Sequence, residues 1–173
     1  MIKLPPRSVP SRDAKYMSLA LMVAGFSKDP HTQMGAVIVS DDNIGLGYGY
    51  NGPPACVDDN AVNWDRPYKY DIMLHAEDNA IDHSPPSLDN ATLYVTGLPC
   101  KRCMLRILSK RIPRVVYLDR TYDKGSMQAV TDDIRAVHEL AKIGKVSLEK
   151  FGGDLRWLEE WVEQLKQMGL LPI

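Results

Sequence analysis

A histidine and two cysteines have the types and spacing of metal ligands. Cys100 and Cys103 lie three positions apart in the stretch PCKRC. If a helix begins there, both thiols face the same side of its first turn, where exposed N–H groups and the helix dipole stabilise thiolates. For this pair alone, three interpretations stay open: two zinc ligands, a redox-active dithiol, or two small residues buried by packing.

His75 offers a third ligand, because it opens another predicted helix. One histidine and two cysteines make three protein ligands, the number found in catalytic zinc sites, where water takes the fourth position. A structural zinc site would need a fourth residue, and Cys56 is a candidate in a long loop. We predict one catalytic zinc ion held by His75, Cys100 and Cys103.

Glu77 follows His75 in the stretch LHAEDNAI and can supply proton transfer. A carboxylate near a zinc-activated water can take its proton and pass it on. Alternatively, an acid in the first turn of a helix simply favours the helix dipole. Asp78 fits that second interpretation better. We therefore predict a catalytic role for Glu77 and none for Asp78.

The order of these motifs resembles the deoxycytidylate deaminases, within the cytidine and deoxycytidylate deaminase superfamily of zinc-dependent enzymes. H-x-E followed by P-C-x-x-C is the signature of zinc nucleobase deaminases. It stands here as HAE at 75–77 and PCKRC at 99–103. The stretches SKDPHTQMGAVIV (27–39) and GYGYNGPP (47–54) extend the resemblance, which covers roughly residues 14–118.

The resemblance implies an α/β fold of three layers, with a mixed five-stranded sheet flanked by helices. It implies hydrolysis of dCMP to dUMP and ammonia, a step that feeds thymidylate synthesis. Carried over residue by residue, the zinc ligands are His75, Cys100 and Cys103. Glu77 would protonate ring atom N3 and then the leaving amine, and Asn51 would contact the sugar.

Two further substrate contacts are expected from the resemblance. Tyr122, in DRTYDKG, matches the region where the family places an aromatic ring near the base, and a surface tyrosine is an equal alternative. Lys28 is a candidate partner of the 5′-phosphate. The sequence does not choose between it and the other basic residues near the motifs, which are Lys101, Arg102, Arg120 and Lys124.

The resemblance also implies partners. The family forms closed homo-oligomers, so a hexamer or dimer is expected, and dCTP and dTTP often regulate it as allosteric ligands. Some members bind a second zinc ion near the N-terminus. This chain has no cysteine before Cys56, so a second site is not expected.

The ligands must be positioned by alternating strands and helices. Strands are expected at 35–40, 44–50, 91–96, 114–118 and 145–150. Helices are expected at 11–26, 75–83, 100–110, from about 130 to 144, and from 154 onward. A strand, a helix and a strand in succession predict a parallel pair with a right-handed crossover. Residues 51–70 form a long loop without periodicity, and such loops are usually functional or mobile.

The chain divides into an irregular lead-in (1–10), a deaminase domain (11–150) and a C-terminal helix (151–173). Leu155, Leu158, Val162 and Leu165 follow one side of that helix, and Trp157 and Trp161 form a neighbouring stripe. Such a stripe favours docking on the core of the domain. The alternative is a subunit contact, where tryptophan is enriched.

Composition limits the other functions. The 173 residues suit one domain, and the net charge of −1 gives no footprint for nucleic acid. No secretory signal or membrane-spanning run is visible, so a cytoplasmic protein is expected. Besides dCMP, a dCTP or modified-cytosine nucleotide stays open as substrate. An editor of bases in RNA or DNA, or a non-catalytic domain, is disfavoured by the charge and by the intact site.

Overall fold

The computed structural model describes residues 8–119 and 127–172, which form an α/β fold. The strands are β1 (Gly35–Ser40), β2 (Gly45–Tyr50), β3 (Ala91–Val95), β4 (Arg114–Tyr117) and β5 (Ser147–Lys150). The helices are α1 (Arg12–Ala24), α2 (Ala76–Asp82), α3 (Lys101–Ser109), α4 (Met127–Gly144) and α5 (Arg156–Gln167). Two short 3₁₀ helices, η1 (Asp59–Ala61) and η2 (Tyr68–Asp71), lie in the segment expected to be a loop.

The strands form one mixed sheet in the order β2-β1-β3-β4-β5. β1 pairs antiparallel with both β2 and β3, whereas β3, β4 and β5 are parallel. Helices α3 and α4 connect the parallel strands, as expected, because a parallel pair needs a crossover of this length. The predicted five-stranded mixed sheet is therefore confirmed.

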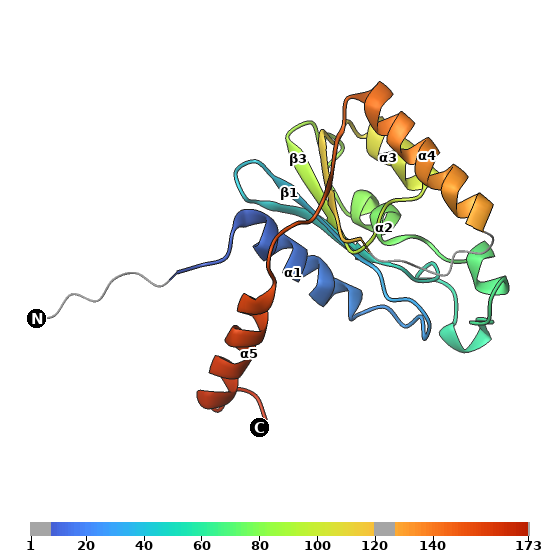
Figure 1. Cartoon of the computed structure of the whole chain (residues 1–173). Coiled ribbons are helices and arrows are strands. Elements are labelled where there is room, and N and C mark those ends of the chain that lie inside the picture. The colour runs from blue at the N-terminus through green and yellow to red at the C-terminus, as the bar shows by residue number, and fades with distance from the viewer. Residues whose placement is uncertain (1–7, 120–126, 173) are drawn as a thin grey trace, which may run out of the picture.

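Side chains of the central strands alternate between two hydrophobic clusters, as the period of two along a strand requires. Val37, Val39 and Tyr94 pack against α1 on one face. Ala36, Ile38 and their neighbours pack against α2, α3 and α4 on the other. Figure 1 shows these helices on opposite sides of the sheet. The three-layer architecture expected from the sequence is confirmed.

Glycines in β2 bring α2 unusually close to the sheet. A Cβ at Gly47 would lie 2.5 Å from the carbonyl oxygen of Ala80, and one at Gly49 would lie 2.6 Å from that of Ala76. Any larger residue would collide with the helix backbone, since close backbone approach is what glycine permits. This contact fixes the position of α2, whose first turn carries His75 and Glu77.

The C-terminal segment departs from the favoured expectation. No residue of α5 is buried, and Figure 1 shows the helix extending away from the sheet. Leu155, just before the helix, packs against the cluster beneath α1. Because the apolar stripe begins at the edge of the domain and then leaves it, docking on the core is not observed. A subunit contact stays a prediction.

Within residues 8–119 and 127–172, none of the helices combines the length and hydrophobicity that crossing a membrane requires.

Candidate active site and metal centre

The first turns of α2 and α3 meet at one point of the structure. His75 is the N-cap residue of α2, and Cys100 is the N-cap residue of α3. A short backbone bridge joins Gly52 to Leu74, with Leu74 N donating to Gly52 O at 2.8 Å. The bridge therefore places Asn51 beside His75, although 24 positions separate them in the sequence.

The three predicted ligands have the geometry of a metal centre. His75 Nδ1 lies 3.5 Å from Cys100 Sγ and 3.2 Å from Cys103 Sγ, and the two sulfurs are 3.6 Å apart. Tetrahedral zinc with ordinary bond lengths would separate its ligands by about 3.6 Å for N and S and about 3.8 Å for two sulfurs. The residues present thus fit a zinc ion bound by three protein ligands.

The thiols favour metal binding over the alternatives left open by the sequence. Contact with Cys103 and with His75 lowers the pKa of Cys100 to about 3, although burial opposes this. The same contact between the thiols raises the pKa of Cys103, and a bound cation removes that asymmetry because a coordinating thiol is deprotonated. Cys56 is exposed and is not part of the ligand group.

Glu77 is buried beside this centre, with 4% of its surface exposed. Burial raises the pKa of Glu77, and the charge of His75 opposes the rise. A carboxyl group whose protonated and ionised forms are both accessible near neutral pH is suited to moving protons. Glu77 also lines a pocket together with His75, Cys100 and Asn51.

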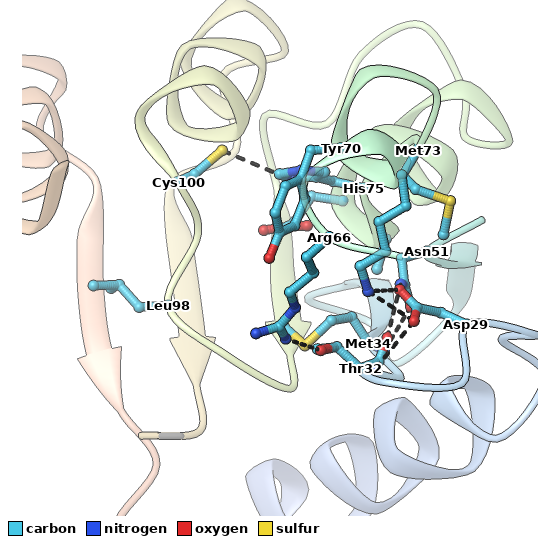
Figure 2. A pocket seen from close by; sticks show the side chains of 13 residues that line it. Asp29, Thr32, Met34, Asn51, Arg66, Tyr70, Met73, His75, Leu98 and Cys100 are labelled. Carbon is cyan, nitrogen blue, oxygen red and sulfur yellow. Dashed lines mark hydrogen bonds and ion pairs between the residues drawn. The ribbon is translucent and has the colours of Figure 1, made fainter. Parts of the chain in front are cut away.

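The same pocket gathers residues that the sequence did not single out. Its lining includes Asp29, Arg66, Lys69 and Tyr70. In Figure 2, Cys100 and Asp29 lie on opposite sides of the view, with His75 between them and Arg66 reaching toward Thr32. Lys69 and Tyr70 belong to η2, where no periodic pattern marks them, so the sequence carried no signal for their position.

The predicted phosphate contact is placed differently. Lys28 forms an ion pair with Asp59, its side chain is 69% exposed, and it is not among the residues that line the pocket. Lys101 and Arg102 are exposed at the start of α3 and also lie outside the lining. Tyr122 and the remaining two basic candidates, Arg120 and Lys124, lie outside the described residues.

Asp78 has a structural role that the sequence interpretation did not include. Its side chain is 8% exposed and accepts a hydrogen bond of 2.7 Å from Arg102 Nη2, between the two cysteines. Arg106 Nε lies 3.4 Å from the other oxygen of Asp78. This carboxylate therefore ties α2 to α3 close to the ligands that each helix contributes.

The substitution Asp78→Asn is expected to weaken zinc binding about tenfold, since partners that hold ligands in place typically change metal affinity by this order. The measurement is competition with a chromogenic chelator. Asp82→Asn is the matched control, because Asp82 also pairs with α3, through Arg106, but is exposed. Equal losses in both variants would contradict a specific role for Asp78.

Comparison with known proteins agrees with this geometry. Residues 10–119 match the family model described as the cytidine and deoxycytidylate deaminase zinc-binding region. The chain is 37% identical over 110 residues to a probable deoxycytidylate deaminase of Caenorhabditis elegans, covering 61% of this chain but only 56% of that protein. It is 32% identical over 143 residues to human deoxycytidylate deaminase, covering 79% and 77% of the two chains.

Solved structures show the same fold. The dCMP deaminase of cyanophage S-TIM5, in complex with dCMP and dUMP, is similar with a TM-score of 0.61 and 25% identity, covering 84% of this chain and all of that one. A tRNA:A34 deaminase is similar with a TM-score of 0.55 and 24% identity, covering 82% and 100%, which shows a shared fold alone. Together with the family model, which matches more than half of the chain, these likenesses show that the protein belongs to the zinc-binding cytidine and deoxycytidylate deaminase family.

Proposed function

We propose that this deaminase acts on deoxycytidine 5′-monophosphate, which it hydrolyses to dUMP and ammonia. The observation that carries the proposal is a single pocket lined by the metal ligands His75 and Cys100, the buried acid Glu77 and the amide of Asn51. The relatives named deoxycytidylate deaminase support it, and the similar phage structure contains dCMP and dUMP.

The chemistry divides between the metal and the protein. A zinc ion with three protein ligands acts as a Lewis acid that makes water a nucleophile near neutral pH. Glu77 lies two residues from His75 and faces the same pocket, so its carboxylate can accept a proton from that water. It then delivers a proton to ring atom N3 and afterwards to the leaving amine, since one buried carboxyl group serves as base and then as acid.

Other pocket residues would hold the nucleotide. Asn51 is the proposed partner of the sugar, and it is 8% exposed on the pocket wall. Tyr70 is an aromatic residue of the lining and can pack against a base. The role of Tyr122 near the base stays a prediction, because that residue lies outside the described part of the chain.

The lining contains a candidate for the phosphate contact. Of its cationic residues, Lys69 is paired with Asp29, and His75 faces the cysteines. Arg66 is exposed on the lining and reaches Thr32 Oγ1 at 3.1 Å. A guanidinium is well suited to a phosphate because it offers paired donors in a fixed plane. We therefore propose Arg66 as the phosphate contact, with Lys28 as the alternative predicted from the sequence.

Two alternatives keep the same chemistry. A deoxycytidine triphosphate or modified-cytosine nucleotide would need only a different phosphate or ring contact. A nucleic-acid substrate is favoured by the fold shared with the tRNA deaminase but disfavoured by the net charge of −1. Regulation by dCTP or dTTP and assembly into a dimer or hexamer stay predictions.

The substrate is tested by turnover of zinc-loaded protein with dCMP, dCTP, deoxycytidine and a cytosine-containing oligonucleotide. We expect the highest kcat/KM for dCMP. A higher value for dCTP or for the oligonucleotide would overturn the proposed substrate. No turnover of any of the four, with zinc bound, would overturn the proposed reaction.

Glu77→Gln is expected to lower kcat about 10²–10⁴-fold, the usual contribution of a general acid–base group. Zinc content, measured by elemental analysis, should equal that of the wild-type protein because Glu77 is not one of the three ligands. Loss of the metal in this variant would show that Glu77 helps to hold zinc and would contradict the assigned role.

Arg66→Gln is expected to raise KM for dCMP about tenfold or more, because a charged hydrogen bond is worth about 1.5–3 kcal/mol. KM for deoxycytidine, which lacks the phosphate, should stay the same. Lys28→Gln tests the alternative in the same assay. If only Lys28→Gln weakens dCMP selectively, the phosphate lies on the other side of the rim and Arg66 is the wrong residue.

A further inference from the structure

A buried ion pair forms part of the pocket wall, outside the metal centre. Lys69 Nζ lies 2.8 Å and 2.6 Å from the two oxygens of Asp29, and both side chains are 2% exposed. Lysine and aspartate are almost never fully buried unless paired. A well-packed apolar pair is often as stable as a buried ion pair, or more stable. Stability alone is therefore a weak reason for these two charges.

Asp29 organises the backbone around it. Its Oδ1 atom accepts hydrogen bonds from the backbone N–H groups of His31 at 2.9 Å and Thr32 at 3.2 Å. Burial alone would raise the pKa of Asp29, but the bonds from Lys69 and from these two N–H groups outweigh it and lower the pKa. Asp29 is consequently ionised, and it can only accept hydrogen bonds.

The ionised carboxylate determines how the amide of Asn51 is used. Asn51 Nδ2 donates to Asp29 Oδ2 at 3.3 Å and to the carbonyl oxygen of Thr32 at 2.9 Å. Asn51 Oδ1 accepts from the backbone N–H of Met34 at 2.7 Å. An amide nitrogen has two donor hydrogens and an amide oxygen has two lone pairs. Both hydrogens are therefore engaged by the protein, while one lone pair of Oδ1 is left over.

The opposite orientation of the amide is excluded by the same neighbours. Rotating it by half a turn would place its oxygen against Asp29 and Thr32 O, which are acceptors, and its NH₂ group against Met34 N–H, which is a donor. Three favourable contacts would become three repulsive ones. Asn51 lines the pocket, so the capacity that it offers to a ligand is that of an acceptor.

We propose that Lys69 and Asp29 are positioning residues that lock the Asn51 amide, so that the pocket selects a nucleotide whose sugar donates a hydroxyl group. The inference rests on the proposed function, since it names the part of the substrate that this amide would read. Lys69 balances the buried charge of Asp29, Asp29 occupies an Asn51 donor, and the remaining acceptor faces the ligand.

The test compares dCMP with 2′,3′-dideoxycytidine 5′-monophosphate, which lacks the 3′-hydroxyl. Wild-type protein is expected to prefer dCMP in kcat/KM by about tenfold to a hundredfold, because a site built to bond a hydroxyl is left unpaired without it. In the double variant Asp29→Asn/Lys69→Met, the preference should fall to about threefold or less, mostly through KM for dCMP. Changing both residues avoids leaving one buried charge alone.

The ratio of the two kcat/KM values is independent of how much of a preparation is folded, so a merely structural role would leave it unchanged. Arg111→Met/Asp89→Asn is the control, because these residues form an exposed ion pair away from the pocket lining. This control should retain the wild-type preference. An unchanged preference in the Asp29→Asn/Lys69→Met variant, or none in the wild type, would overturn the proposal.

A second measurement does not depend on turnover. The side-chain NH₂ signal of Asn51 in ¹⁵N-labelled wild-type protein, assigned by its loss in Asn51→Asp, is expected to exchange slowly with solvent because both hydrogens are bonded. Fast exchange would overturn the lock even if the double variant fails to fold. If the wild type turns over neither nucleotide, the proposed function fails, while this measurement still decides whether the amide is locked.

Discussion

The close contact between α2 and β2 is the constraint on which the site depends. Only glycine at positions 47 and 49 lets the helix backbone lie directly on the strand. With α2 in that position, His75 at its N-terminus reaches the first turn of α3, which follows the neighbouring strand β3. The metal centre is thus set by backbone packing before any ligand is bound, and the two cysteines then complete it from a single helical turn.

Charged groups around the centre are paired, and each pair joins segments that are distant in the sequence. Asp78 and Arg102 join the two helices that carry the metal ligands. Asp29 and Lys69 join the segment before β1 to the segment before α2. Because isolated buried charges are costly and paired ones are at best nearly neutral, these pairs hold geometry more than they add stability. A site that must orient a ring, a water molecule and a proton carrier needs such fixed positions.

The segment between β2 and α2 connects this geometry to substrate choice. It contributes Asn51 at its start and Arg66, Lys69 and Tyr70 further along, so one connection supplies much of the pocket wall opposite the metal ligands. The C-terminal helix stands apart from this arrangement. Its apolar residues are not buried within the chain, so the helix does not position the site.

The sequence by itself determined the metal centre and most of the fold. Ligand types, the spacing of three between Cys100 and Cys103 and the helix starts are local properties, and strand alternation follows from the pattern of apolar residues. The five strands and the three layers were therefore predictable. Only the tertiary structure decided that Lys69 and Asp29 meet, that Arg66 lines the pocket while Lys28 does not, and that Asp78 reaches Arg102. Those contacts join residues through space across irregular segments, where no periodicity fixes the direction of a side chain.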